Sequence, residues 1–319
     1  MRAVWLKEFG GPEVLVAGDA PDPVAGPGQA LVEVEFVNIT FVETQIRRGG
    51  FGPFEPELPM IPGNGVGGVV TAVGPGVDDA LVGTRVVSAT GGSGAYAELA
   101  AVDAAGLIAV PGAVALDDAV ALLADGRTAM WLIGAAAPRQ GERVLVEAAA
   151  GGVGGLLVQL ARTAGATVIG AAGGPRKGEV ARGLGAHVVV DYREDGWAER
   201  VREAVGGLDV VFDGVGGAIA RSAFGLLGPG GRMLSFGMAG GEWAPISQED
   251  AAERGVGLVQ GAQVTPELSR SLTEKVLAEA AAGRVRPTIG QRFPLERAAD
   301  AHAVIESRAS VGKTLLTVR

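Results

Sequence analysis

The feature that most constrains this sequence is a turn almost without side chains, set between a short apolar run and an amphipathic segment. Residues 143–147, RVLVE, are rich in β-branched side chains and predict a strand. Residues 148–155 contain only alanine, glycine and one valine, and Leu156, Leu157 and Leu160 then follow at helical spacing. The pattern predicts a strand, a glycine-rich turn and a helix.

This turn matches the dinucleotide-binding fingerprint, with Ala149 in place of the first glycine, followed by Gly151 and Gly154. The missing Cβ at Gly151 would let a pyrophosphate approach the backbone, and Gly154 would let the helix pack close to the strand. The free amides of the first helical turn would face the phosphates. An ordinary tight turn is the alternative, because the chain contains 53 glycines. The predicted nucleotide contacts in this turn are Ala150, Gly151, Gly152 and Val153.

Composition limits the classes of protein and of site. A chain of 319 residues suits two domains, and its 48% hydrophobic and 20% charged residues indicate a globular, enzyme-like protein. The net charge of −9 gives no general attraction to nucleic acid or to anionic membranes. The absence of cysteine excludes Cys-ligated zinc, and only two histidines, His187 and His302, are present, so no metal site is predicted. The N-terminus lacks the apolar core of a signal peptide, and we expect a cytoplasmic enzyme.

The order of apolar runs predicts two kinds of architecture. Up to about residue 120, short runs such as 30–37 and 66–73 are separated by Gly/Pro clusters, which indicates an all-β region and a distorted barrel. From residue 143, strand and helix patterns alternate, which predicts an α/β fold with a doubly wound parallel sheet. The tail, 292–319, is expected to add a helix and a last strand to the β-rich part.

Several motifs together resemble one known family over nearly the whole chain. They are GGPEVL at 10–15, IRRG at 46–49, IPGNGVGGVV at 61–70, DGVGG at 213–217 and the ending HAVIESRASVGKTLLTVR. With the glycine turn, they make the chain similar to the quinone oxidoreductase (zeta-crystallin-like) branch of the zinc-independent medium-chain dehydrogenases/reductases.

The resemblance implies a domain organisation and an activity. It implies a discontinuous GroES-like catalytic domain at 1–122 and 284–319, and a Rossmann domain that binds NADPH at 123–283. NADPH would donate hydride to a quinone or an α,β-unsaturated carbonyl in the interdomain cleft, and the protein would be a homodimer. The apolar stretches at 232–236 and 256–260 could pair across a two-fold axis.

The second strand of the α/β region bears on the choice of nicotinamide cofactor. NAD-preferring domains place an acid about 20 residues after the glycines, to bind the ribose 2′-OH. Residues 168–177, VIGAAGGPRK, contain no acid; Gly173 and Gly174 leave room for a 2′-phosphate, and Lys177 could bind it. One such bond contributes about 1.5–3 kcal/mol, or roughly a 10- to 100-fold preference for NADPH. A solvated helix start is the alternative for Arg176 and Lys177.

The resemblance adds further candidate residues. By spacing, Lys177 and Tyr192 match the family's 2′-phosphate ligands, and Arg308 matches an arginine brought toward the cofactor; surface positions are the alternatives for Tyr192 and Arg308. Thr128 would lie near the nicotinamide, where a helix residue bonded to its own backbone is the alternative. The remaining predicted cofactor contacts are Gly214, Val215, Phe236 and Gly237.

The resemblance implies that Thr40, Phe51, Asn64 and Thr128 line the substrate pocket, and no side chain is assigned to catalysis. Thr40 stands where many relatives have asparagine and Phe51 where a tyrosine is found, so a more apolar cleft is expected. The usual Gly-His-Glu metal-binding stretch here contains Asn64 and Gly65, so a metal-polarised alcohol or aldehyde is disfavoured. Quinones and enones accept hydride without a Lewis acid. The alternatives are an enoyl reductase for a biosynthetic thioester or pathway intermediate and a non-catalytic NADPH-binding protein.

Overall fold

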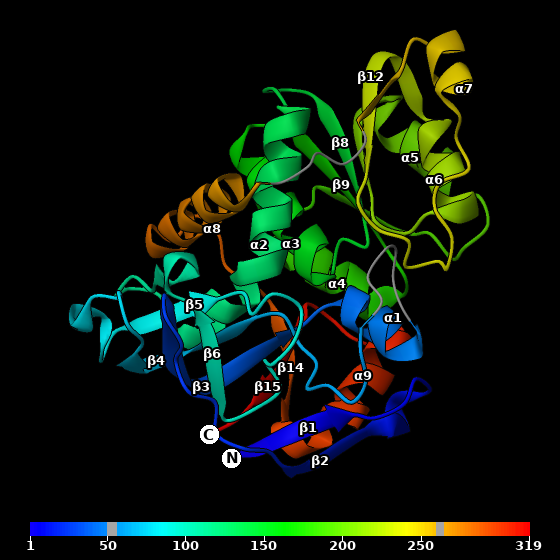
Figure 1. The fold of residues 1–319 in the computed structure, drawn as a ribbon. Coiled ribbons are helices and arrows are strands. Elements are labelled where there is room, and N and C mark those ends of the chain that lie inside the picture. The colour runs from blue at the N-terminus through cyan, green and yellow to red at the C-terminus, as the bar shows by residue number, and fades with distance from the viewer. Residues whose placement is uncertain (50–55, 260–264) are drawn as a thin grey trace. The chain divides into compact units, whose positions relative to one another are not determined.

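The computed structural model describes residues 1–49, 56–259 and 265–319. The chain divides into two compact units (Figure 1). Unit 1 comprises Met1–Arg127, Pro266–Gly283 and Pro287–Arg319, and unit 2 comprises Thr128–Thr265 and Arg284–Arg286. The units group Pro266–Gly283 with unit 1, whereas the sequence analysis assigned that stretch to the second domain. The domain ranges 1–122 with 284–319, and 123–283, stay a prediction.

Unit 1 is built around one long strand, β3 (Gln29–Ile39). One edge of β3 pairs with β4 (Val66–Val73), and the other edge is shared by β6 (Leu99–Asp103) and β15 (Lys313–Thr317). The C-terminal strand therefore returns to the β-rich unit. The sheet continues with β5 (Arg85–Ser88), β7 (Ile108–Ala109) and β14 (Ile289–Pro294), and a separate pair is formed by β1 (Arg2–Leu6) and β2 (Leu15–Asp19). The described pairings run from β14 to β7, and the distorted barrel expected from the sequence stays a prediction.

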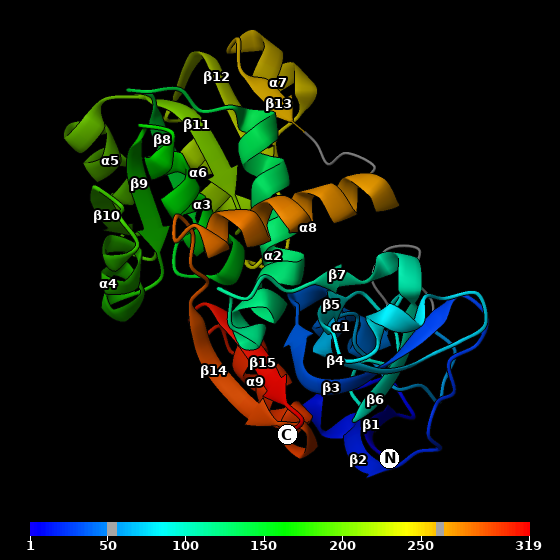
Figure 2. The ribbon, with the colours of Figure 1, turned by 90° about the vertical axis from the view of Figure 1, so that its left-hand side faces the viewer.

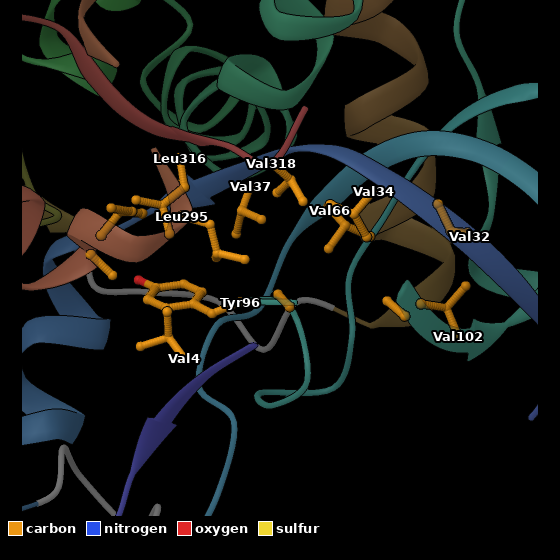
Figure 3. Packing of buried hydrophobic residues seen from close by; sticks show 14 of the residues in the cluster. Val4, Val32, Val34, Val37, Val66, Tyr96, Val102, Leu295, Leu316 and Val318 are labelled. Atoms are coloured by element: carbon orange, nitrogen blue, oxygen red, sulfur yellow. The ribbon is translucent and has the colours of Figure 1, made fainter. Parts of the chain in front are cut away.

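The core of unit 1 gathers alternate residues of these strands. Val32, Val34 and Val37 of β3 are buried, and Figure 3 shows them facing Val66 and Val102 from neighbouring segments. Tyr96 lies at the edge of the same cluster. Val32 and Val34 alternate with period two, and the register shift between Val34 and Phe36 moves the next buried valine to Val37.

Helix α1 (Phe41–Gly49) interrupts the region that the sequence analysis interpreted as all β. The residues Thr40-x-x-Glu43 form the pattern of a capping box, and the Glu43 carboxylate accepts a hydrogen bond from the Thr40 amide. The Arg47 side chain is buried and pairs with Glu306 at the end of α9 (Ala298–Glu306). A helix cap and a buried ion pair therefore stabilise α1 in a region where the sequence pattern predicted only strands.

Two long helices belong wholly or partly to unit 1. In α2 (Leu116–Ala136), a Cβ atom at Gly126 would lie 2.9 Å from Val276 of α8 (Pro266–Ala281), so the two helices pack closely there. Asp125 of α2 forms a 2.8 Å ion pair with the buried Lys313 of β15. By length and composition α2 is the one described helix that could cross a membrane, but half of its most apolar stretch is buried within the protein, as in a core helix.

Unit 2 contains a parallel six-stranded sheet in the order β10-β9-β8-β11-β12-β13 (Figure 2). The chain winds outward from β8 to β10 and returns to the other side of β8 at β11, so the switch point lies between β8 and β11. The strands are β8 (Arg143–Glu147), β9 (Thr167–Ala172), β10 (Val188–Asp191), β11 (Leu208–Asp213), β12 (Leu227–Ser235) and β13 (Gly257–Val259).

Helices cover both faces of this sheet. Trp197 and Val201 of α5 (Trp197–Val205) and Ala220 of α6 (Gly217–Phe224) share one buried cluster with Leu145 and Val211 of the strands. Helix α3 (Gly152–Thr163) lies on the opposite side in Figure 1. The other helices of the chain are α4 (Pro175–Gly183), α7 (Gln248–Glu253) and the short 3-10 turns η1 (Pro12–Val14), η2 (Asp79–Leu81), η3 (Ala104–Gly106) and η4 (Leu295–Arg297).

The buried pair of Tyr96 and His302 makes the stability of unit 1 depend on pH. The Tyr96 hydroxyl lies 2.8 Å from His302 Nε2, and burial, followed by the charge of Arg47, lowers the pKa of His302 to about 3. Below the ordinary pKa of 6.5 the unfolded chain binds a proton that the folded chain does not. Stability should therefore fall as the pH drops, by at most about 1.4 kcal/mol per pH unit.

His302→Gln is expected to flatten this dependence between about pH 6 and pH 4, because it removes the titrating group. It should cost about 1–3 kcal/mol at pH 7 through the altered bond to Tyr96. Chemical unfolding at several pH values measures both effects. The control is His187→Gln, which removes an exposed imidazole that lies outside this pair. An unchanged slope in His302→Gln would contradict the assignment.

Candidate functional site

The turn between β8 and α3 exposes backbone amides at the carboxyl end of a strand. Gly151 is the N-cap of α3, and no side chain caps the helix there. The Gly151 amide donates to the Ala148 carbonyl at 2.7 Å, which closes the turn. Of the other residues predicted from the sequence, Ala150 lies in this turn, and Gly152 and Val153 lie in the first turn of α3. An uncapped helix N-terminus at a strand end is suited to bind a phosphate group.

Gly154 holds α3 against β8 at a distance that other residues do not permit. A Cβ atom at Gly154 would lie 2.3 Å from the Ala148 carbonyl oxygen and 3.1 Å from that of Glu147. A Cβ atom at Gly151 would meet the Ala148 oxygen at 3.1 Å, a tight contact. The geometry thus agrees with the close helix–strand packing that the sequence assigned to Gly154.

The next strand ends in a second glycine bend. Strand β9 ends at Ala172, so its tip carries no carboxylate, and Gly174 adopts φ +98° as the N-cap of α4. A Cβ atom at Gly173 would lie 3.2 Å from the Tyr192 hydroxyl oxygen, so the structure brings these two predicted residues together. Lys177 lies in the first turn of α4 and is partly buried.

Arg193 is a residue at this bend that the sequence analysis missed. A Cβ atom at Gly174 would lie 2.5 Å from Arg193 Nη2, so the guanidinium covers the bend. Arg193 donates from Nε (3.1 Å) and Nη2 (2.8 Å) to the two oxygens of Asp191, and these bonds are the main cause that lowers the pKa of Asp191 to about 2. The available signal was the position of Arg193 directly after Tyr192, at the end of β10.

The loops after β11 and β12 also meet. A Cβ atom at Gly214 would lie 2.7 Å from the Phe236 ring, and one at Gly237 would lie 2.9 Å from the Gly214 carbonyl oxygen. The Phe236 amide donates to the Asp213 carbonyl at 2.8 Å. The predicted residues Gly214, Val215, Phe236 and Gly237 therefore form one cluster at the carboxyl ends of neighbouring strands.

Thr40 and Asn64, predicted for the substrate side, are joined by a side chain that the sequence analysis did not single out. The buried Glu43 carboxylate accepts hydrogen bonds from the Thr40 amide and, at 2.9 Å, from the Asn64 amide. Burial raises the pKa of Glu43, and these amides oppose that rise. The capping-box spacing from Thr40 was the signal that could have identified it. Phe51 lies outside the described residues.

The two remaining candidates belong to different units. Thr128 is partly buried on α2 in unit 2. Arg308 is exposed after α9 in unit 1, with φ 58°. Their roles stay predictions. In the part of the chain that the structure describes, no group of three or more His, Asp or Glu residues is arranged to hold a metal ion.

The contact at Gly154 generates a stability prediction. Gly154→Ala should destabilise the protein by about 1–3 kcal/mol, because the added methyl group would meet backbone atoms that cannot move aside. The matched control is Gly183→Ala at the end of α4, where a Cβ atom meets nothing within 4 Å. That change should be neutral or stabilise by about 0.5–1 kcal/mol. Denaturant unfolding compares the two variants; equal stabilities would refute the packing role of Gly154.

Comparisons with known proteins agree with this geometry. Residues 26–112 match the family described as the alcohol dehydrogenase GroES-like domain, and residues 152–275 match the one described as zinc-binding dehydrogenase. The chain is 33% identical to a quinone oxidoreductase of Pseudomonas aeruginosa, over 99% of both chains. It is 35% identical to a 2-haloacrylate reductase of a Burkholderia species, over 99% of this chain and 98% of that protein.

Solved structures give the same result. The structure of the Escherichia coli quinone oxidoreductase complexed with NADPH matches with a TM-score of 0.91 and 30% identity, over 99% of this chain and 100% of that one. These relatives cover both the β-rich and the α/β parts. The chain therefore belongs to the quinone oxidoreductase branch of the medium-chain dehydrogenase/reductase family.

Proposed function

We propose that this protein is an NADPH-dependent reductase that transfers hydride directly to a quinone or an α,β-unsaturated carbonyl compound. Family membership supports an oxidoreductase, and the observation that carries the cofactor assignment is the bend after β9. That bend has no carboxylate at its strand tip, and Tyr192 and Arg193 cover its glycines. The same choice of cofactor is recorded for the related Escherichia coli enzyme, whose structure contains NADPH.

The residues of unit 2 fit this cofactor at two of its charged groups. The uncapped amides at the start of α3 would bind the pyrophosphate, and Gly151 leaves space for it. Lys177, Tyr192 and Arg193 would bind the 2′-phosphate through charge-assisted hydrogen bonds. The nearby Asp191 carboxylate would not repel that phosphate strongly, because Arg193 already pairs with it.

NADPH supplies the hydride when it is bound, and the protein supplies position and exclusion of water. Gly214, Val215, Phe236 and Gly237 would contact the nicotinamide half, because they cluster beside the switch point. Thr40, Phe51, Asn64 and Thr128 stay the proposed substrate-side residues. Since neither a cysteine nor the usual histidine at position 64 is present, we propose that no zinc polarises the acceptor.

A second candidate substrate class has specific support. The relative from the Burkholderia species is named as a reductase of 2-haloacrylate, a conjugated acid. A conjugated thioester or acid therefore stands beside quinones as the acceptor of this chain. A non-catalytic NADPH-binding role is the remaining alternative, and binding without turnover of any electrophile would support it. A homodimer, a cytoplasmic location and the lack of nucleic-acid and membrane partners stay predictions.

Removing the charge of Lys177 tests the cofactor assignment. Lys177→Ala should raise the KM for NADPH about 10- to 100-fold and leave the KM for NADH nearly unchanged, because only NADPH carries the 2′-phosphate. Steady-state kinetics with both cofactors measures this. The control is Arg182→Ala, which removes an exposed positive charge from the same helix. An equal rise of both KM values would reject the role of Lys177.

A screen of acceptors tests the reaction. NADPH oxidation is expected with quinones, enones or conjugated acids and not with simple ketones or aldehydes, because a simple carbonyl needs a metal or a general acid to polarise its oxygen and neither is proposed here. Treatment with a metal chelator should leave the rate unchanged, since the cysteine and histidine ligands are missing. A rate that is lost with the chelator and restored by zinc would contradict the metal-free mechanism.

A further inference from the structure

Two acidic side chains meet at the switch point of the sheet in unit 2, and the reaction proposed above uses neither. Glu147 is the last residue of β8, and Asp213 is the last residue of the adjacent strand β11. Both have an exposed fraction of 0%. Burying an isolated carboxylate is costly, so a pair of them needs an explanation.

Asp213 has the bonds expected of an ionised acceptor. Its Oδ1 accepts from the amides of Val215 (3.0 Å) and Gly216 (2.7 Å), and its Oδ2 accepts from the Ser235 hydroxyl (2.7 Å). Three donors thus converge on one carboxylate. Asp213 thereby fixes the start of the loop at residues 214–216 and ties it to the end of β12.

Glu147 has weaker hydrogen-bond donors around it than Asp213. Its Oε2 accepts a long hydrogen bond from the Val215 amide at 3.3 Å, and its Oε1 receives none from the described residues. The main-chain amides of Val215 and Gly214 oppose the rise of its pKa less strongly than burial and Asp213 cause it. The Asp213 carboxyl lies within hydrogen-bonding reach of Glu147. A buried carboxyl oxygen without a donor is satisfied when the carboxyl group carries a proton and a second carboxylate within reach accepts it.

The surroundings of Glu147 offer no compensating cation among the groups that act on it most strongly. Burial is the largest cause that raises its pKa, and the charge of Asp213 is the next. From β9, Ala171 pairs beside Glu147; the following turn, 148–151, contains only alanine and glycine; and β12 contributes Ser235. Two carboxyl groups this close cannot both be ionised without a large cost in free energy.

We propose that Glu147 keeps its proton at neutral pH and donates it in a hydrogen bond to Asp213, and that this buried acid pair positions the loop at 214–216. The loop is sensitive to small shifts, because a Cβ atom at Gly216 would lie 1.9 Å from the Glu242 carbonyl oxygen. Since Gly214 and Val215 are proposed nicotinamide contacts, the functional half of this inference rests on the proposed function. Glu147 is a positioning residue and touches no reacting atom.

Stability as a function of pH tests the shared proton without any cofactor. Above the ordinary pKa of 4.5, Glu147 ionises in the unfolded chain and stays protonated in the folded one, so this residue makes wild-type stability fall with rising pH. Glu147→Gln cannot ionise and keeps a donor toward Asp213. Its folding equilibrium constant relative to wild type should grow by up to about tenfold per pH unit between pH 5 and the folded pKa.

The matched control is Glu203→Gln, which removes an exposed carboxyl group on α5 and leaves the buried pair intact. Asp213→Asn is the second variant: it removes the neighbouring charge, so Glu147 should ionise more readily and the pH slope should shrink. Infrared difference spectra of wild type minus Glu147→Gln should contain a protonated-carboxyl band at pH 7. A constant ratio for Glu147→Gln, or the absence of that band, would overturn the shared proton.

Cofactor binding tests the positioning role separately. Glu147→Gln should keep the NADPH Kd within about twofold, whereas Glu147→Leu, which has no donor for Asp213, should raise it about tenfold in folded protein. Equal Kd values for both variants would overturn the positioning role. If wild type itself does not bind NADPH, the proposed function fails, but the pH experiment still decides whether the acid pair exists.

Discussion

The α/β unit depends on the distance between a helix and the strand that precedes it. Helix α3 begins so close to the end of β8 that the Gly154 backbone approaches the Ala148 carbonyl, and no larger residue fits there. This approach keeps the first-turn amides of α3 at the edge of the sheet, next to the point where the strand order reverses. A single packing contact thus determines where the uncapped amides lie that are proposed to bind the pyrophosphate.

The residues at the strand ends differ in charge between the outer strands β9 and β10 and the central strands β8 and β11. After β9 and β10, glycines lie beneath Tyr192 and Arg193, with Lys177 in the first turn of α4. Between β8 and β11, the buried carboxyl groups of Glu147 and Asp213 lie side by side, and no cation is among the described groups that shift the pKa of Glu147 most. The bend after β9 and β10 suits a phosphate monoester. The acid pair between β8 and β11 is proposed to position the main chain of the loop at 214–216. The parallel sheet brings both to one edge, because all its strands end on the same side.

Much of this arrangement could be predicted from the sequence, and the exceptions have physical reasons. The turn at Gly154 and the alternating strands and helices are local patterns, and local patterns are visible in sequence. Helix α1 was missed because its stability comes from the Glu43 cap and the buried Arg47, not from a long apolar repeat. Arg193 was missed because its proposed role depends on its position over the bend at Gly174, which the sequence alone does not reveal. The pairing of Glu147 with Asp213 depends on strand order, which brings together residues 66 positions apart.

The bonds made by Glu43 limit the chemistry available on the β-rich side. The Glu43 carboxylate accepts hydrogen bonds from the main-chain amides of both Thr40 and Asn64. The side-chain oxygen of Asn64 accepts a hydrogen bond from the main-chain amide of Gly92 at 2.9 Å. These two main-chain donors are therefore unavailable to stabilise an enolate or phenolate oxygen that gains charge as hydride arrives. The Thr40 hydroxyl is also hydrogen-bonded to Glu43, so this carboxylate engages both polar donors of Thr40. Under the proposed function, an acceptor bound beside Glu43 would have to be electron-poor enough to accept hydride without these donors.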